Sequence, residues 1–334
     1  MRRRITGWQS PFATNGAYVN GDVMTARWTT RTTIAAVVTA PLVTIPVTAQ
    51  AAPAPPPAST AAGPRGVAAK SAYLFDSGTR KTRWSRAADT RRPIASLTKV
   101  MTAMVVIRAG RLDRKITVRK KHVDYVRKTD ATRAWLRVGD KLTVRQLLNA
   151  MMLPSGCDAA YVLADAYGPG WKGFVAKMNK TARQLRMTRT KYANFDGLPW
   201  PTGTATGSTA RDQIKLAHHA MKNREFRAIV ARKSFTLRAG GGHGAYRWTN
   251  TNRLLSSYRG TIGIKTGKTD LAGYSLMFAA RRGKRTLIGV VLNSSATKEQ
   301  VRFTDAMRML NWGFGVRTTG VLKVAPVPPG ANID

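Results

Sequence analysis

The sequence reads PIASLTKVMT over residues 93–102, at the start of a segment, 94–109, that is apolar on nearly every side. A helix of that kind belongs inside a core. Ser96 and Lys99 are three positions apart, which places them on one face of a helix, one turn from each other. A neutral lysine amine there could take the proton from the serine hydroxyl, and the amino end of the helix would favour the negative charge that develops. Ser96 is therefore a candidate nucleophile.

Two short motifs further along the chain could complete a site with Ser96. In Ser155-Gly156-Cys157 the glycine allows a tight turn that presents two side chains to a cleft. Lys265-Thr266-Gly267 is expected on a strand, where a fixed cation beside a hydroxyl can hold a substrate carboxylate. Each motif alone could equally be an ordinary loop or strand end. A second Ser-x-x-Lys, at residues 295–298, is interpreted as a helix cap after a strand.

The segments around these motifs predict an α+β fold. Strands are expected near both chain ends, with helices in the middle and one helix near the C-terminus. One antiparallel sheet would then join the two ends of the chain, with helices packed on it and a helical subdomain. The expected strands are a hairpin around 72–75 and Trp84, and a meander of 263–266, 272–280 and 286–293; the expected helices are 94–109, 144–152, 159–166, 178–185, 208–221 and 297–312.

The composition describes a globular and very basic chain. Apolar residues make up 43% of the 334 residues, which is enough for a core. There are 56 Lys and Arg against 16 Asp and Glu, a formal net charge of +40. Such a surplus favours polyanionic partners, namely nucleic acid, anionic membranes or the phosphate-bearing polymers of a bacterial wall. The alternative is a basic proteome whose protein surfaces are simply rich in arginine.

The N-terminal region has the pattern of an exported protein. Arg27 and Arg31 precede a short apolar run that ends in Ala49-Gln50-Ala51, as in a signal peptide, and Met1 or Met24 could be the start. The predicted organisation is a signal peptide, an Ala/Pro-rich linker, a catalytic domain and a short tail. Export favours an extracellular or wall-associated protein over a nucleic-acid binder, and no membrane anchor is seen. The boundaries are 1–51, 52–67, 68–316 and 317–334.

Metal and disulfide chemistry are not expected. Cys157 is the single cysteine, so neither an intrachain disulfide nor a cysteine-based zinc site can form. The four histidines show no ligand spacing and are interpreted as surface or packing residues. No cofactor is predicted. The histidines are His122, His218, His219 and His243.

Taken together and in this order, the three motifs resemble those of the penicillin-binding proteins and serine β-lactamases. Residues 93–102 in particular resemble the signature of the low-molecular-mass D-alanyl-D-alanine carboxypeptidases, and the likeness covers about residues 70–314. It implies a β-lactamase/transpeptidase-like fold, peptidoglycan stem peptides as substrate and β-lactams as inhibitors. Further similar segments are 194–198, 208–212, 252–255 and 263–270.

The resemblance also implies roles for individual residues. Ser96 would be acylated, Lys99 would be its base, and Ser155 would relay a proton toward the leaving D-Ala. Substrate binding would fall to the remaining motif residues: Lys265 and Thr266 would hold the terminal carboxylate beside Gly267, and the N–H groups of Ser96 and Lys268 would form the oxyanion hole.

Cys157 departs from the family pattern, because most members carry Asn there. An Asn side chain can donate to a substrate carbonyl and accept from the lysine, whereas a thiol does both poorly. Some Streptomyces DD-transpeptidases of the family also carry Ser-Gly-Cys. Two interpretations stay open: a small filler beside Ser155, or a drier site that disfavours attack by water and tilts the enzyme toward transpeptidation.

Three other functions fit the sequence less well than a DD-carboxypeptidase or transpeptidase. A class A β-lactamase needs a Glu to activate the deacylating water, and the chain has only Glu225 and Glu299, with no Glu between Ser155 and Glu225. A non-catalytic wall-binding protein would not need an intact Ser96 and Lys99. The signal peptide argues against a nucleic-acid binder. The sequence leaves open whether water or an amine accepts the acyl group.

Overall fold

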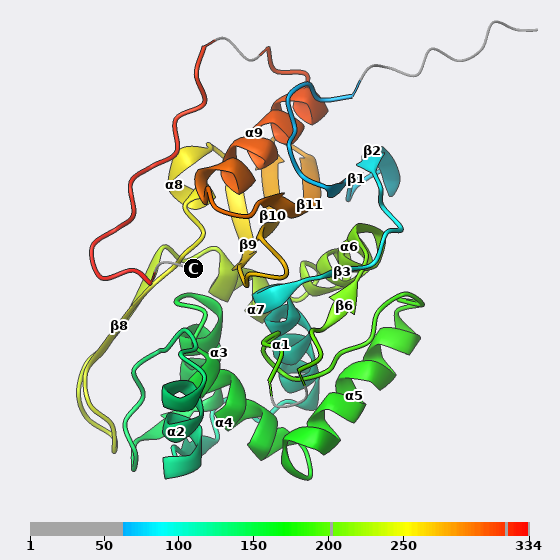
Figure 1. Ribbon diagram of the computed structural model, residues 1–334. Coiled ribbons are helices and arrows are strands. Elements are labelled where there is room, and N and C mark those ends of the chain that lie inside the picture. The colour runs from blue at the N-terminus through cyan, green and yellow to red at the C-terminus, as the bar shows by residue number, and fades with distance from the viewer. Residues whose placement is uncertain (1–62, 201–202, 318–319, 333–334) are drawn as a thin grey trace, which may run out of the picture. The chain divides into compact units, whose positions relative to one another are not determined.

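The computed structural model describes residues 63–200, 203–317 and 320–332 (Figure 1). The predicted signal peptide and most of the predicted linker therefore lie outside the described residues. The described residues belong to one compact unit. Within these ranges, no helix is both long and apolar enough to cross a membrane.

Five antiparallel strands form the main sheet, and they come from both ends of the described chain. Their order across the sheet is β2-β1-β11-β10-β9. The first strand therefore pairs with the last, and Tyr73 lies opposite Val290. This arrangement confirms the predicted sheet. The strands are β1 (Ser71–Asp76), β2 (Lys81–Arg86), β9 (Thr261–Gly267), β10 (Tyr274–Arg282) and β11 (Arg285–Ser295).

Both faces of the sheet are covered, because successive side chains of a strand point to opposite faces. Leu74 and Val291 pack on one face with α9 (Gln300–Phe314), which lies over β10 and β11 (Figure 1). Tyr73 and Val290 point to the other face and join the core of the helical region. The sheet thus separates two clusters of buried apolar side chains.

The helical region is built around α1 (Thr98–Ala109), which follows a short 3₁₀ turn, η1 (Ala95–Leu97). Residues 98–106 are all buried, as the apolar character of this segment predicts. The other helices are α2 (Lys120–Lys128), α3 (Val144–Met152), α4 (Cys157–Tyr167), α5 (Gly170–Gln184), α6 (Ala210–Ala220), α7 (Arg224–Val230) and α8 (Leu254–Ser257). Three short strand pairs complete the fold: β3 (Arg92–Pro93) with β6 (Gly207–Ser208), β4 (Lys115–Thr117) with β5 (Lys141–Thr143), and β7 (Ser234–Leu237) with β8 (Tyr246–Thr249).

Several elements differ from the sequence prediction. Helices α2 and α7 and the β7–β8 hairpin were not predicted, and α2 buries only three of its nine residues, so few apolar side chains mark it in the sequence. Helix α5 begins at Gly170 rather than Met178. Its first turns hold two glycines, which are poor helix formers, but a Cβ on Gly173 would lie 2.5 Å from Pro169 Cδ. Glycine is therefore needed at 173 to leave room for the Pro169 ring.

The predicted helix cap at Ser295 is wrong. Helix α9 begins at Gln300, and no side chain caps its amino end. Ser295 Oγ instead accepts the N–H groups of Thr297 and Lys298, at 3.2 and 2.9 Å, in the turn before the helix. This hydroxyl therefore stabilises the exit from β11.

The described part of the tail, residues 320–332, runs back along the domain as an extended segment (Figure 1). Arg253 Nε donates to Ala325 O at 2.6 Å, which holds the segment to α8. Farther on, Asn332 Nδ2 donates to Pro154 O at 2.8 Å. The tail thus reaches the residue that precedes the Ser-Gly-Cys motif.

Candidate active site

Ser96 and Lys99 meet at the junction of η1 and α1. Lys99 Nζ lies 2.7 Å from Ser96 Oγ, and the lysine side chain is fully buried. The amine also donates to Cys157 Sγ and to Asp196 O, both at 3.3 Å. All three of these partners are uncharged groups. Ser96 is half-buried.

The turn that presents Ser96 is held by the loop 194–197. Ala95 has φ +46, a backbone conformation that is uncommon for a residue with a Cβ. Gly197 lies directly against it, and a Cβ there would come within 1.9 Å of Ala95 O. Asn194 Oδ1 accepts the N–H of Gly197 at 2.7 Å and fixes the loop in this position. Only glycine fits at 197, and the loop braces the strained turn.

The Ser-Gly-Cys motif connects α3 to α4. Ser155 has φ +65, so the left-handed residue is the serine and not the glycine, whose φ is −58. Gly156 is needed for space, because a Cβ there would lie 2.6 Å from Ala134 Cβ and 2.7 Å from Ala150 O. The Ser155 side chain is fully buried, and its hydroxyl has no hydrogen-bond partner in the described part of the chain. Such a group is unusual in a protein core and is common at functional sites.

The Cys157 thiol is the third group around the lysine amine. It is buried, and burial raises its pKa despite the opposing effect of Lys99. The thiol is therefore neutral at physiological pH, and it is a poor nucleophile. Its backbone N–H donates to Thr132 O at 2.8 Å, which ties the amino end of α4 to the preceding loop.

The strand β9 brings the third motif to the same place. Lys265 and Thr266 are both buried, and Lys265 Nζ lies 3.3 Å from Thr266 Oγ1. A Cβ on Gly267 would lie 3.2 Å from Ser96 N and 3.2 Å from Ile94 O, so this glycine permits the strand to pass close to the nucleophile. The three motifs therefore converge on the start of α1, as the sequence analysis expects.

Lys268 is placed less simply than its neighbours. Its side chain is at the surface, where Nζ pairs with Asp270 Oδ1 at 3.0 Å. Its backbone directly follows Gly267 and is therefore near Ser96.

Two aspartates that were not predicted as site residues support the site. Asp196 accepts from Lys99 through its carbonyl and from the Tyr125 hydroxyl through Oδ2 at 2.6 Å; burial and this carboxylate raise the pKa of the phenol. Asp158 is buried beside Cys157 and accepts backbone N–H groups. The signal for Asp196 was the Asn-x-Asp-Gly segment, whose asparagine and glycine are typical of a tight turn. An acid in the first turn of α4 was the signal for Asp158.

The histidines lie away from these motifs. His122 Nε2 is 3.3 Å from Asp165 Oδ2, and the ring of His218 packs edge-on against Phe75. Within the described ranges, no group of three or more His, Cys, Asp and Glu side chains could hold a metal ion.

Comparison with known proteins agrees with this arrangement. The family model for D-alanyl-D-alanine carboxypeptidases matches residues 58–296. A D-alanyl-D-alanine carboxypeptidase of Streptomyces sp. strain K15 is 46% identical over 262 residues, which cover 75% of this chain and 88% of that protein. The crystal structure of the Streptomyces K15 DD-transpeptidase is similar with a TM-score of 0.70 at 46% identity, covering 75% of this chain and 98% of the other. A carboxypeptidase structure from Mycobacterium tuberculosis is similar with a TM-score of 0.68 at 29% identity, covering 81% and 95%. The chain therefore belongs to the D-alanyl-D-alanine carboxypeptidase family and has the fold of its penicillin-binding enzymes.

Proposed function

We propose that the protein cleaves or exchanges the D-Ala–D-Ala bond of peptidoglycan stem peptides through an acyl-enzyme on Ser96. The observation that carries this is the 2.7 Å contact between Ser96 Oγ and the buried amine of Lys99. A nucleophile and a base within hydrogen-bond reach, with the base oriented by other groups, is the arrangement that acyl transfer needs.

Acylation follows from this contact. As Ser96 Oγ attacks the carbonyl carbon of the penultimate D-Ala, its proton passes to the neutral amine of Lys99. The tetrahedral intermediate then collapses, the C–N bond breaks, and the leaving D-Ala nitrogen takes a proton that is relayed through Ser155. The partnerless, buried hydroxyl of Ser155 is free for that relay.

The oxyanion and the terminal carboxylate need separate partners. We assign the oxyanion to the N–H groups of Ser96 and Lys268, which is supported by the close approach of Gly267 to Ser96 N. We assign the terminal carboxylate of the substrate to Lys265 and Thr266, because they form a buried cation and hydroxyl on the strand next to the nucleophile. Gly267 leaves room for the substrate backbone.

A serine β-lactamase is the less well supported alternative. Its class A form needs a glutamate near the acyl-enzyme, and the chain holds two glutamates in all. Glu225 pairs with Arg145, and Glu299 pairs with Arg302 at 2.7 Å. Neither is recorded in contact with Ser96 or Lys99. We expect β-lactams to acylate the protein and leave slowly, as inhibitors do. The non-catalytic alternative gives no reason for the Ser96–Lys99 contact.

Export and wall attachment remain part of the proposal. We propose residues 1–51 as a signal peptide and residues 68–316 as the catalytic domain. We also propose anionic wall polymers as a partner, because residues 1–51 carry only five Arg and one Asp of the charges behind the net +40, so the remaining chain stays strongly basic. Binding to isolated walls should then weaken as salt rises, since the Debye length shrinks from about 10 Å at 0.1 M to about 3 Å at 1 M. Retention that is independent of salt would contradict electrostatic attachment.

A product analysis tests the activity. Purified protein is incubated with a peptide ending in D-Ala-D-Ala, with and without an amino-acid acceptor, and the products are separated. Release of D-Ala alone indicates a carboxypeptidase, and an acceptor-linked product indicates a transpeptidase. If neither product forms in the unmutated enzyme and both substrate and acceptor are recovered intact, the proposal is wrong.

A further inference from the structure

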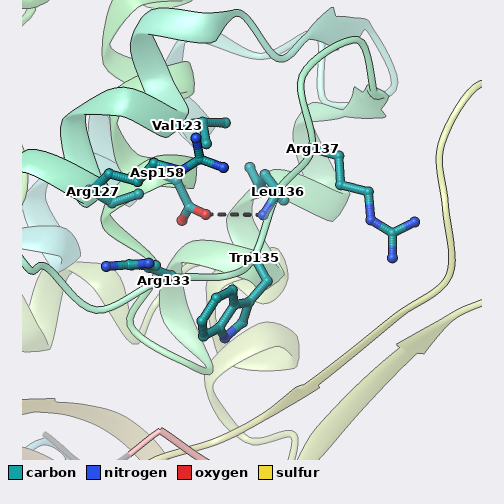
Figure 2. A pocket seen from close by; sticks show the side chains of 8 residues that line it. Val123, Arg127, Arg133, Trp135, Leu136, Arg137 and Asp158 are labelled. Carbon is teal, nitrogen blue, oxygen red and sulfur yellow. Dashed lines mark hydrogen bonds between the residues drawn. The ribbon is translucent and has the colours of Figure 1, made fainter.

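A cavity of about 340 Å³ lies beside the Ser-Gly-Cys motif and shares only Asp158 with the residues described above (Figure 2). It is bounded by α2, by the loop 131–137 and by the amino end of α4. Arg127, Arg133 and Trp135 supply its charged and aromatic surface, and Val123 and Leu136 supply apolar surface. We call Arg127, Arg133 and Trp135 the Arg–Trp pocket.

Trp135 is presented to solvent by a strained but firmly held backbone. Its side chain is 66% exposed, and its φ is +60, a conformation that costs free energy for a residue of this size. The N–H groups on either side of it, of Ala134 and Leu136, donate to the buried carboxylate of Asp158 at 2.9 and 3.1 Å. Trp248 Nε1 also donates to Ala134 O at 2.9 Å. The Arg133 guanidinium lies over the indole, 5.4 Å from the ring centroid, so the two side chains form one surface.

Arg127 and Arg133 outnumber the one carboxylate in the lining, Asp158, so the pocket carries a net positive charge. Figure 2 shows the side chains of Arg127 and Arg133 around the Asp158 carboxylate, while the Arg137 guanidinium points away from it. Among the described residues, the acid recorded with Arg133 is the fully exposed Asp130, at 3.6 Å, and no ion pair is recorded for Arg127. An exposed pair of that length is weak. Both guanidinium groups can therefore bind an external anion.

The pocket and the Ser-Gly-Cys motif share a wall. A Cβ on Gly156 would lie 2.6 Å from Ala134 Cβ and 2.8 Å from Asp158 Oδ1. Asn332 Nδ2 donates at 2.8 Å both to Arg133 O and to Pro154 O, so one amide spans the pocket loop and the residue before Ser155. The pocket loop and the segment that carries Ser155 are therefore in direct contact.

We propose that the Arg–Trp pocket is a subsite for a free carboxylate in the peptidoglycan stem peptide, upstream of the D-Ala–D-Ala bond. The inference rests on the proposed function, because it names the part of that substrate that the pocket takes. A guanidinium group matches a carboxylate with two parallel hydrogen bonds, and the indole covers the apolar surface of the adjoining residue. The pocket should therefore bind stem peptides that keep this carboxylate more tightly than those in which it is amidated.

Binding of two matched peptides tests the subsite. Both are pentapeptides ending in D-Ala-D-Ala, and they differ only at the second residue, which is D-glutamate with a free α-carboxylate or the corresponding amide. Calorimetry uses the Ser96→Ala protein, so that neither peptide is turned over. The free acid should bind roughly tenfold more tightly, as expected for a partly exposed charge-assisted pair. Equal affinities would overturn the proposal.

Variants locate the effect. Arg127→Gln and Arg133→Gln, in the same background, should each reduce the preference for the free acid, and together they should remove it. Trp135→Ala should weaken the binding of both peptides to a similar extent. Lys128→Gln is the matched control, because it removes an exposed charge from the same helix outside the pocket, and it should keep the preference. An equal loss in Lys128→Gln would show a general effect of charge and would also overturn the proposal.

Covalent labelling separates this inference from the proposed function. β-Lactam labelling of the unmutated enzyme reports on Ser96 without using the stem peptide. If the enzyme is labelled but does not distinguish the two peptides, the subsite is wrong and the proposed function stands. If Ser96 is not labelled, the proposed function fails whatever the calorimetry shows.

Discussion

The chain contains two Ser-x-x-Lys segments, and the structure puts them to different uses. At residues 96–99 the serine and lysine lie on one helical turn, the lysine is fully buried, and the two side chains are in contact. At residues 295–298 the backbone is a turn, Lys298 is exposed, and the Ser295 hydroxyl is occupied by backbone N–H groups. The same four-residue pattern therefore forms a nucleophile and base pair only where a helix sets the spacing and a core surrounds the amine.

The largest expected difference between the two segments is in covalent labelling. A β-lactam should acylate Ser96 and remain attached, so intact-mass analysis should find one adduct. That adduct should be absent in Ser96→Ala and unchanged in Ser295→Ala, because the Ser295 hydroxyl already accepts two backbone N–H groups. An adduct that persists in Ser96→Ala would end the assignment of the nucleophile.

The next largest difference should be in the effect of replacing Lys99 or Lys298 on the acylation rate. Lys99→Ala removes the amine 2.7 Å from Ser96 Oγ and should slow acylation by about 10²–10⁴-fold, the usual range for a general base. Lys298→Ala should leave the acylation rate unchanged. The rates are measured by stopped-flow with a chromogenic β-lactam, and thermal unfolding checks that the buried substitution still folds. A rate that Lys99→Ala barely alters in a folded protein would move the base elsewhere.

These differences show what sequence could and could not supply. The buried helix after Ser96, the helix 144–152 and the sheet joining both chain ends were predicted, because their apolar patterns are strong and local. Helix α2 was missed because it exposes most of its charged surface, and the start of α5 was hidden by two glycines. The convergence of Ser96, Cys157 and Gly267 depends on contacts between residues far apart in the chain. The order of the three motifs along the chain predicted that they would meet only because the same order is found in a known family.

The strand β9 adds a contrast that the Ser295 segment lacks, namely a buried cation for the substrate carboxylate. Amidating the C-terminus of the substrate should therefore reduce kcat/KM by roughly 10–100-fold, since hydrogen bonds to charged groups are worth about 1.5–3 kcal/mol. The Lys265→Ala enzyme should then have similar kcat/KM values for the free acid and the amide. Equal rates on both substrates in the unmutated enzyme would refute the carboxylate clamp.

The smallest expected effect concerns Cys157, the third group around the Lys99 amine. Its thiol lies 3.3 Å from Nζ, and burial raises its pKa, so a neutral and weak hydrogen-bonding group occupies a position where an amide could bind the acyl chain. Cys157→Asn would add a donor for the substrate carbonyl and a polar surface for water. If the thiol keeps the site dry, the ratio of hydrolysis to aminolysis should rise in Cys157→Asn.

One net hydrogen bond is worth about 1 kcal/mol, so the change in that ratio should be roughly fivefold. Cys157→Ala is the matched control, because it removes the thiol without adding an amide and should leave the ratio near that of the unmutated enzyme. Both reactions are followed with one acyl donor, with and without an amine. An unchanged ratio in Cys157→Asn, with both rates intact, would show that the thiol only fills space.

Alkylation gives an independent check: Cys157 should react slowly because it is buried and neutral, and a bound β-lactam should protect it further. Rapid alkylation with full activity would place the thiol outside the cleft and would break its link to Lys99.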